Sequence, residues 1–599
     1  MRAMFCWLAM FCLTVATARA EIRIEFAMDH DPDVTPPEPI QRFPENLLSL
    51  WLKALARPEA EMQRMAAESI AQAHAFQLPD IEKSKPALLK VVTAESSHSA
   101  ARFAAARALI VLDARDTAAA LFEASQRHGT DLRQLVEPVL AKWKFEPIRS
   151  VWQKRLITPN THLRDLMLAI RGMREVGDGA NAEVLLKIMH DSLRPVAVRL
   201  EAARSAGSLK SSGLEEDALR FRNTTSSSIF DRLCAVALLD RHRTDATQAA
   251  LLQLAQDAEP SVAAAALVSL NANDPSLVVP IAEQAMRNDD ANVREQGVSA
   301  FVARPTPERV AMLTRMLDDP HSGLRAAVRE SLFRLAQTTE LDASIREGAS
   351  AVLAGDSWRG QEQAALLLAA LDHKTVASRL VELLESPRDE VLITAAWGLR
   401  KFAILETLPA MLDKAVRQTE IRKKSGASSS LDIQVALLCE AFGMMKYAPA
   451  KELLKRYIPK DFVMGERSRC AAIWSLGHLH ADQPDEGLAK LLFERLTESG
   501  LMPGEWDSVR NMSVISMARM KTRTQMEPTR KFLFSRGPPE TMNLANRWAL
   551  QEMTGETFPE PKPVIVMRFG WFLEPLEKPA SEEKPSVAAP LTVKPNDLK

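Results

Sequence analysis

The sequence contains few of the residues that build β-sheets and tight turns. Only two of its 599 residues are tyrosines and 22 are glycines, whereas alanine, leucine, arginine and glutamate are frequent. Proteins rich in β-structure are enriched in aromatic and β-branched residues, while the frequent residues here favour helices. The composition therefore argues against a β-rich fold and favours a helical one.

Sequence motifs for common chemistry are also missing. There is no glycine-rich phosphate loop, no His-Glu-x-x-His helix and no Gly-x-Ser-x-Gly elbow, so the usual nucleotide-binding, zinc-protease and hydrolase signatures are absent. The formal net charge is −1, from 76 basic and 77 acidic residues, which gives no general attraction for nucleic acid or an anionic membrane. We expect no catalytic residue, no cofactor and no nucleic-acid partner.

Cysteine is scarce and shows no ligand pattern. After the first twenty residues only Cys234, Cys439 and Cys470 remain, and none of them belongs to a Cys-x-x-Cys pair. Three thiols cannot all pair, and this spacing argues against a zinc knuckle, a thioredoxin-type redox pair or attached haem. We expect three buried, free thiols in apolar helices.

Two other clusters have the residue types of a metal site but not its spacing. The acidic run from Asp29 to Asp33, which includes His30, lacks the glycine and the distal glutamate of a calcium loop. His478 and His480 are two residues apart, which places them about 200° from each other on a helix. We expect a solvated acidic turn and no metal site.

The first twenty residues have the pattern of a signal peptide. Arg2 precedes the uncharged apolar run from Met4 to Val15, and Ala18 and Ala20 provide the small residues that a signal peptidase needs before Glu21. An uncleaved anchor is the less favoured alternative, because twelve apolar residues fall short of the roughly 20 that cross a bilayer. We expect export to the periplasm, cell envelope or exterior, with no integral membrane segment after cleavage.

A repeat occupies most of the chain. Residues 101–109 and 198–206 share one plan, in which a polar residue, usually arginine, is followed by small or apolar residues three, four, six and seven positions later. We call this polar position the register residue; six of the intervals between successive register residues are 31 residues long. The positions are Gln63, Arg102, Arg133, Arg164, Arg199, Arg232, Ala263, Arg294, Arg325, Gln361, Leu392, Gln434, Arg469 and Arg510.

The repeat spacing predicts a pair of helices. Positions 3, 4 and 7 fall on one face of an α-helix, and a second apolar helix usually precedes the register residue. The turn between them has helix-start residues, as in Asp289-Asp290 and Asp318-Asp319-Pro320. Thirty-one residues equal two helices of about three turns each. One pair cannot bury its apolar face alone, so neighbouring pairs must stack.

These features resemble the HEAT-repeat superfamily, and specifically the short bacterial HEAT-like repeats. The motif is a Val-Arg-x-x-Ala-Ala-x-x-Leu type helix after an Asp/Pro turn, and the resemblance covers about residues 50–555. The resemblance implies an all-α superhelix, a HEAT-like solenoid of about 14 two-helix repeats, which serves as a protein-interaction scaffold. The clearest copies of the motif begin at Val198-Arg199, Val293-Arg294 and Val509-Arg510.

The sequence departs from the motif at three positions. Ala263 and Leu392 replace the arginine, so the contacts of that arginine cannot be assumed there. Pro138 falls inside the second helix of its copy and is expected to kink it.

We divide the chain into five segments. The apolar run from Val564 to Phe572 is expected to cover the last repeat, because solenoid ends need a cap. The basic stretch from Arg417 to Lys424, which leads into Gly426–Ser430, is expected to be a flexible solvated loop. The segments are a signal peptide (1–20), an extended Pro-rich lead-in (21–49), the solenoid (50–555), a C-terminal cap segment (556–574) and a disordered Pro/Glu/Lys tail (575–599).

One repeat position changes character along the chain. Five residues after the register residue, the earlier copies carry Glu68, Arg107, Arg204, Ser299 and Glu330, and the later copies carry Leu366, Trp397, Cys439, Trp474 and Ile515. This position flanks the buried stripe of the helix. Its residues either pack between neighbouring second helices or open onto the inner curve of the superhelix.

If the position opens onto the inner curve, four of these residues form an apolar ladder. Such a ladder suits a protein or peptide partner, because aromatic anchors dominate interface energetics. The candidate partner-binding residues are Leu366, Trp397, Trp474 and Ile515, flanked by Lys401, His478 and Arg519.

The function expected from these observations is that of an exported, non-enzymatic scaffold that binds a protein or peptide along the concave surface of the solenoid. Two alternatives stay open. One is an enzyme or enzyme subunit of the HEAT-like lyase type, and the other is a purely structural spacer.

Overall fold

The computed structural model describes residues 22–223, 228–425, 429–498, 504–522, 524, 530, 541–558 and 563–574. The expected signal peptide (1–20) and disordered tail (575–599) lie outside these residues. The described chain divides into two units. The N-terminal unit contains residues 39–269 and 565–574, and the C-terminal unit contains residues 22–38 and 270–564. Each unit therefore includes a segment from the opposite end of the chain.

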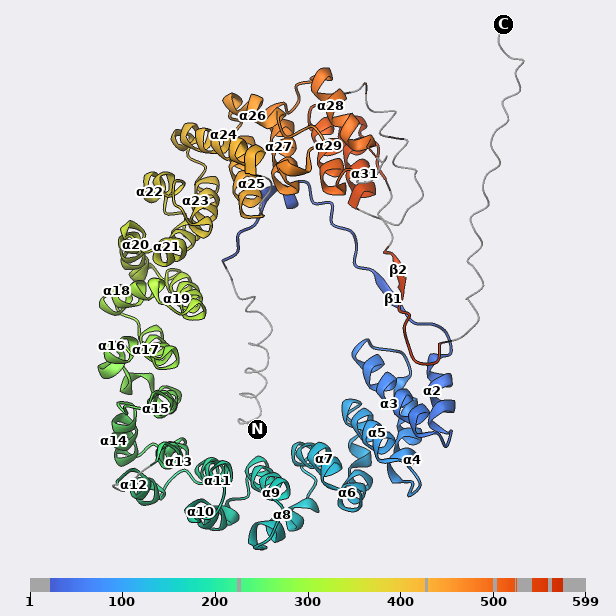
Figure 1. Cartoon of the computed structure of the whole chain (residues 1–599), viewed down its shortest axis with the longest axis vertical. Coiled ribbons are helices and arrows are strands. Elements are labelled where there is room, and N and C mark those ends of the chain that lie inside the picture. The colour runs from blue at the N-terminus through green and yellow to red at the C-terminus, as the bar shows by residue number, and fades with distance from the viewer. Residues whose placement is uncertain are drawn as a thin grey trace, which may run out of the picture. The chain divides into compact units, whose positions relative to one another are not determined.

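The N-terminal unit is a succession of helix pairs (Figure 1). Its helices are α2 (Leu47–Leu55), α3 (Ala60–Ala75), α4 (Lys85–Thr93), α5 (Ser99–Val111), α6 (Ala118–Arg127), α7 (Thr130–Lys142), α8 (Ile148–Ile157), α9 (Leu163–Val176), α10 (Ala182–His190), α11 (Val196–Leu209), α12 (Glu215–Asn223), α13 (Ile229–Leu239) and α14 (Asp245–Leu254). Helix α15 (Pro260–Asn273) spans the division between the units.

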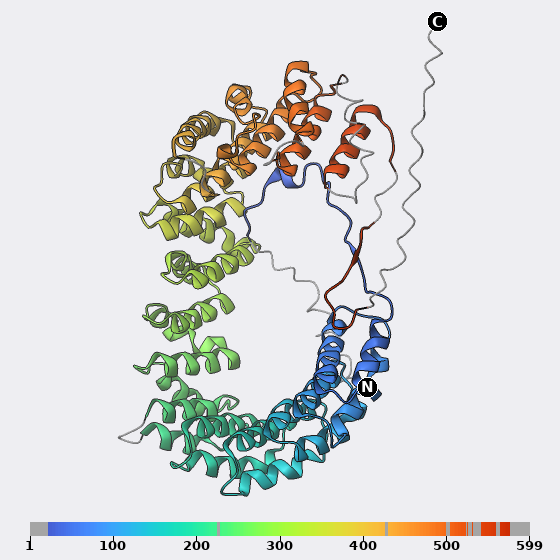
Figure 2. The same cartoon turned by 45° about the vertical axis from the view of Figure 1, so that its right-hand side comes forward.

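The C-terminal unit continues the same pairing (Figure 2). Its helices are α16 (Val279–Met286), α17 (Ala291–Ala303), α18 (Pro307–Arg315), α19 (Ser322–Leu335), α20 (Thr339–Ala354), α21 (Trp358–Ala370), α22 (Ala377–Leu383), α23 (Asp389–Phe402), α24 (Leu408–Ser425), α25 (Ser429–Met444), α26 (Lys451–Lys455), α27 (Glu466–Leu479), α28 (Glu486–Thr497), α29 (Asp507–Arg519) and α31 (Thr541–Thr554). Short 3-10 turns join several helices: η1 (Ala27–Asp29), η2 (Ile81–Ser84), η3 (Arg115–Thr117), η4 (Gly179–Asn181), η5 (Pro275–Leu277), η6 (Met316–Asp318), η7 (Lys374–Val376), η8 (Leu405–Thr407), η9 (Ala448–Ala450) and η10 (Phe462–Met464).

The predicted all-α fold of about 14 two-helix repeats is confirmed. Each of the fourteen register residues lies in its own odd-numbered helix, from α3 to α29, and an even-numbered helix precedes it. We call the odd-numbered helices the second helices. Helix-start chemistry also appears where expected: the Asp290 carboxylate caps α17 by accepting from the N–H groups of Asn292 and Val293.

The register residue joins the two helices of its pair. The Arg102 guanidinium donates to the carbonyls of Val92 and Ala94, at the C-terminal end of α4. In the same way Arg199 donates to the Met189 carbonyl in α10, and Gln63 donates to the Leu55 carbonyl in α2. The last carbonyls of a helix have no partner within the helix, so a donor at this position satisfies them and fixes the angle between the two helices.

Small residues let successive second helices approach closely in the C-terminal unit. A Cβ atom placed on Gly443 of α25 would lie 2.7 Å from the Cα atom of Ser475 in α27. A Cβ atom on Gly477 of α27 would lie 2.9 Å from the Cα atom of Ser516 in α29. Side chains at these two positions would push the helices apart, so α25, α27 and α29 form a closely packed row.

One local expectation is not met. The stretch Arg417–Lys424 is not a loop: it forms the end of α24, where Arg422 is buried and donates to the Ser468 hydroxyl in α27. Composition alone cannot distinguish a basic helix end that buries one arginine from a solvated basic loop. Helix α7 runs through Pro138 to Lys142, and Pro138 is exposed.

The C-terminal cap segment does not cover the last repeat. Its strand β2 (Ile565–Met567) pairs in parallel with β1 (Ile40–Arg42) in the N-terminal unit. The indole of Trp51 in α2 donates to the Phe572 carbonyl, and Trp571 packs 5.6 Å from the Trp51 ring, measured between ring centroids. The segment therefore covers the first repeat. In the C-terminal unit α29 packs against α31, which ends before the left-handed Gly555.

Among the described residues, no helix is both long and apolar enough to cross a bilayer.

Candidate partner-binding face

The four residues of the apolar ladder lie on second helices of the C-terminal unit and are all buried. Leu366 in α21 is 6% exposed, Trp397 in α23 and Trp474 in α27 are each 2% exposed, and Ile515 in α29 is 1% exposed. We call the side of α21, α23, α25, α27 and α29 that carries this row the second-helix face. The flanking cations lie beside the ladder: the Lys401 ammonium is 5.2 Å from the centroid of the Trp397 ring.

The second-helix face carries the beginning of the described chain. Residues 22–33, which we call the N-terminal segment, run along α25, α27 and α29 (Figure 1 and Figure 2). The segment begins where Ile22 N–H donates to the Glu330 carboxylate in α19, at 3.1 Å. It is extended except for η1, which contacts α27. Glu330 is also the last polar residue of the ladder position, so the segment starts where the sequence of that position changes.

Side chains of the face bind the main chain of the N-terminal segment. The Arg400 guanidinium donates to the Glu25 carbonyl at 2.7 Å, and Met28 N–H donates to the Glu440 carboxylate at 2.8 Å. The Trp474 indole and the Arg519 guanidinium both donate to the Asp31 carbonyl, each at 2.9 Å. These bonds use groups that every peptide has, so they recognise an extended backbone rather than particular side chains.

Three side chains of the segment add contacts before Asp31. The Met28 side chain is 3% exposed. The Arg467 guanidinium of α27 lies 4.9 Å from the centroid of the Phe26 ring and forms an ion pair with the Asp29 carboxylate at 2.6 Å. Phe26, Met28 and Asp29 therefore fix the segment in register on α27.

The Asp31 carboxylate occupies a pocket formed by Trp474, His478 and Arg519, which we call the carboxylate pocket. One carboxylate oxygen lies 2.8 Å from His478 Nε2, and the other lies 2.8 Å from an Arg519 nitrogen. The Arg519 guanidinium lies between two indole rings, 5.7 Å from the centroid of Trp474 and 5.8 Å from that of Trp548. Both oxygens of the acid are thus bound by donors from two neighbouring helices.

The charges of the carboxylate pocket depend on each other. Burial alone would raise the pKa of Asp31, but the hydrogen bond from His478 and the charge of Arg519 outweigh it and lower that pKa below 3.8. Burial lowers the pKa of Arg519, and Asp31 opposes this effect. Asp31 is therefore the main counter-charge of a buried cation.

A second buried ion pair lies under the middle of the segment. The Arg400 guanidinium contacts the Glu440 carboxylate at 2.6 Å, and the Glu440 side chain is fully buried. Burial raises the pKa of Glu440, and the charge of Arg400 with the N–H groups of Met28 and Ala27 offsets only part of this effect. The carboxylate is therefore held by the N-terminal segment as well as by Arg400.

The thiols and histidines give no sign of other chemistry. The three free cysteines are buried, as predicted, and burial raises the pKa of Cys234 to about 11 and that of Cys470 to about 12. Such thiols stay protonated and unreactive at neutral pH. Within the described residues, no group of three or more His, Cys, Asp or Glu side chains lies close enough together to hold a metal ion.

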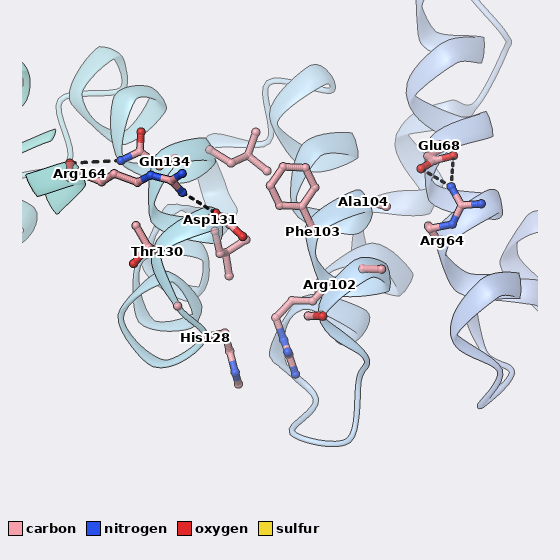
Figure 3. A pocket seen from close by; sticks show the side chains of 15 residues that line it. Arg64, Glu68, Arg102, Phe103, Ala104, His128, Thr130, Asp131, Gln134 and Arg164 are labelled. Carbon is pink, nitrogen blue, oxygen red and sulfur yellow. Dashed lines mark hydrogen bonds and ion pairs between the residues drawn. The ribbon is translucent and has the colours of Figure 1, made fainter. Parts of the chain in front are cut away.

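The N-terminal unit presents its second helices differently. At the ladder position Glu68, Arg107 and Arg204 are exposed. A cavity of about 890 Å³ opens between α3, α5 and α7 (Figure 3). Four of its charged groups form two ion pairs: Arg64 binds Glu68, and Arg164 binds Asp131. The lining includes Phe103, which is 39% exposed. This cavity is a solvent-open hollow lined by both charged and apolar side chains.

Sequence reasoning identified the ladder but missed its occupant. The segment was expected to be an extended lead-in, and nothing local indicates that it binds residues more than 300 positions away. One signal was available. The segment has acidic residues at Glu25, Asp29, Asp31 and Asp33, and the flanks of the ladder are basic.

Comparisons with known proteins match part of the chain to a repeat family. Residues 247–332 match the HEAT_2 family of HEAT repeats. No curated protein matches the chain. Solved structures with a similar course include Kap95p with RanGDP (TM-score 0.47, 12% identity, 85% of this chain and 72% of that chain) and yeast importin-β, Kap95p (0.42, 13%, 85% and 72%). Another is Kap121p bound to Nup53p (0.48, 11%, 86% of this chain and 57% of that chain).

The matched residues cover α15, α17 and α19, and the same helix pair occurs before and after them. The register contact of Arg102 lies outside the matched range and is made in the same way as that of Arg325, which donates to the Asp319 carbonyl within it. The described chain is therefore an α-solenoid of stacked helix pairs, and residues 247–332 of it match HEAT repeats.

Proposed function

We propose that this protein is an exported, non-enzymatic scaffold that binds a protein or peptide partner along the second-helix face of α21–α29. The observation that carries the proposal is the N-terminal segment, which the face holds by four bonds to its main chain from Arg400, Glu440, Trp474 and Arg519. Because these bonds do not depend on sequence, the same side chains can hold an extended segment of another protein.

The place of action follows from the leader. Arg2, the apolar run and Ala18-Arg19-Ala20 support export, with action in the periplasm, the cell envelope or outside the cell. Mass spectrometry of the fractionated protein is expected to find Glu21 at the N-terminus. Recovery of intact Met1 from washed membranes would contradict export of a cleaved protein.

The structural-spacer alternative has one observation in its favour, because the ladder is already buried beneath the chain itself. Site-specific photo-crosslinking in the native compartment separates the two functions. A photo-reactive residue replaces Lys401, which is exposed beside the ladder, and the control replaces Arg107, which is exposed on a second helix of the N-terminal unit.

A scaffold that binds along α21–α29 is expected to give the same intermolecular adduct from position 401 in repeated preparations, and not from position 107. Adducts from position 401 that contain only residues 22–33 of the same chain would favour the spacer. Equal adducts from both positions would remove the second-helix face as the binding site.

A further inference from the structure

The occupied face shows what kind of ligand it is built to hold. Most contacts reach the main chain of the N-terminal segment, and four of its side chains make specific ones: Phe26 under Arg467, the buried Met28, Asp29 on Arg467, and Asp31 in the carboxylate pocket. The face therefore requires only four particular side chains of its ligand, and the last of them along the peptide is a carboxylate.

The carboxylate pocket is the most demanding part of this requirement. The Arg519 side chain is 10% exposed, and its Nη1 atom has no hydrogen-bond partner among the described residues. A buried cation without a counter-charge is strongly unfavourable. Both oxygens of Asp31 are bound, and the indole of Trp474 closes one side. A neutral side chain of the same size cannot supply the missing negative charge.

The occupant is held without secondary structure of its own beyond η1. Asp31 is 47% exposed at its side chain, and the chain that follows includes the exposed residues Asp33, Thr35, Pro36 and Glu38. When another extended peptide replaces the segment, the side chains of the face lose their bonds to the segment and form the same bonds to that peptide. It requires no helix of the C-terminal unit to unfold.

We infer that the second-helix face binds extended acidic peptides that place one carboxylate between His478 and Arg519, and that the N-terminal segment is an exchangeable stand-in for such a ligand. This inference rests on the proposed function. The ligand has an aromatic residue, an unbranched apolar residue two positions later, and acids three and five positions after the aromatic. The basic flank of Arg400, Lys401 and Arg467 complements that charge.

The experiment uses the full chain with a protease site inserted between the exposed residues Glu38 and Pro39. Cleavage after folding leaves the N-terminal segment bound but no longer covalently attached. The probe is a synthetic peptide of residues 22–35 with a fluorophore at its C-terminus, and binding is followed by fluorescence anisotropy. Unlabelled peptides then compete with the probe.

The unmodified peptide is expected to displace the probe, and the Asp31→Ala peptide is expected to compete at least tenfold more weakly. The matched control is the Asp33→Ala peptide, which also loses one carboxylate, but one that is exposed and bonds only to Thr35. It is expected to compete within about twofold of the unmodified peptide. Because the peptides carry the changes, folding of the protein is not affected.

A second peptide tests the ligand class. It keeps Phe26, Met28, Asp29 and Asp31 and has alanine at the other positions; it is expected to compete within about fivefold of the unmodified peptide. A protein variant, Arg519→Gln, is expected to weaken the unmodified peptide more than the Asp31→Ala peptide, because both peptides lose the bond to the carbonyl of residue 31 but only the unmodified one loses the ion pair.

Each contrary result has a distinct meaning. If the Asp31→Ala peptide competes as well as the unmodified peptide, the carboxylate subsite is wrong, although a peptide-binding face remains. If the alanine-filled peptide fails, the stated ligand pattern is wrong. If no peptide displaces the probe or the segment, exchange is refuted, and the crosslink from position 401 decides separately whether the scaffold function survives.

Discussion

Three repeats of the N-terminal unit and the last repeats of the C-terminal unit use the same repeat position in opposite ways. In the N-terminal unit the ladder position carries Glu68, Arg107 and Arg204, which are exposed. In the C-terminal unit it carries Trp397 and Trp474, which are buried. The register contact is the same in both units, so the helix pair does not dictate the residue at this position. That residue depends instead on what lies on the second helices.

The ends of the units show the same dependence on a borrowed segment. In the N-terminal unit the fully buried Trp51 contacts Trp571 and donates to the Phe572 carbonyl. In the C-terminal unit Trp474 donates to the Asp31 carbonyl. In both cases a tryptophan on an early or late repeat is satisfied by a chain segment from the opposite terminus. The termini are therefore structural parts of the repeats that they cover.

The largest expected effect is from deleting residues 22–33 while keeping the leader. The deletion removes the partners of Arg400, Glu440, Trp474 and Arg519 together, and each large apolar side chain returned to water costs about 1.5–3 kcal/mol. We expect the C-terminal unit to lose on the order of 5 kcal/mol of stability. Hydrogen exchange is expected to speed up in α25, α27 and α29.

The N-terminal unit provides the internal control for this deletion, because residues 22–33 do not belong to it. Exchange in α3, α5 and α7 is expected to stay unchanged. Equal acceleration in both sets of helices would show that the segment acts on the whole chain rather than on the face it occupies.

A single substitution tests the covered and the open position directly. Trp474→Ala removes a buried indole and its bond to the Asp31 carbonyl, and is expected to cost about 3–5 kcal/mol. Arg204→Ala changes an exposed residue at the same repeat position and is expected to stay within about 0.5 kcal/mol. Denaturant unfolding of both variants measures the difference. Similar losses would mean that the two faces do not differ as described.

A pair of truncations tests the borrowed segment of the N-terminal unit. Removing residues 565–599 deletes β2 and Trp571 and uncovers Trp51, and is expected to cost about 2–3 kcal/mol through re-exposed apolar area. Removing only residues 575–599 deletes a Pro-, Glu- and Lys-rich tail with little apolar area, so the melting temperature is expected to stay nearly the same. Equal melting temperatures for the two truncations would refute the capping role.

The sequence alone predicted the features that the repeat determines, which are the helix pairs and the change along their second helices. The spacing of the register residues located the second helices because each helix pair solves the same packing problem in about 31 residues. The change after Glu330 correctly marked where the second-helix face alters, since from there on this position carries the buried residues Leu366, Trp397 and Trp474, whereas five of the earlier copies carry polar ones. Periodicity reveals that such a row exists, but it does not reveal what covers it.

Long-range pairing escaped prediction for a physical reason. The apolar run from Val564 to Phe572 indicates only that the segment packs against an apolar surface. The first repeat provides such a surface as well as the last does. Asp31 and His478 are 447 residues apart, and their attraction leaves no local pattern. The stretch Arg417–Lys424 was wrongly expected to be a loop. Its many charges favour a solvated loop, but its helical spacing places Arg422 in the interior.

The smallest expected effect is the pH dependence of the carboxylate pocket, and it sharpens the comparison because the exposed ladder position of the N-terminal unit has no such pocket. The pKa of Asp31 is lowered below its ordinary value of 3.8 when the segment is bound. For an acid whose pKa is lowered by binding, the stabilisation is fully present above the free value and is lost as the pH falls through the bound value. We therefore expect the affinity ratio of the Asp31 and Asp31→Asn peptides for the cleaved protein to shrink as the pH falls below 3.8. Glu440 of the protein, whose raised pKa acts in the opposite direction, contacts both peptides in the same way. Its titration therefore cancels in the ratio. Anisotropy titrations at each pH measure it, and a ratio that changes between pH 7 and pH 5 but not below pH 3.8 would show that a group other than Asp31 controls the binding.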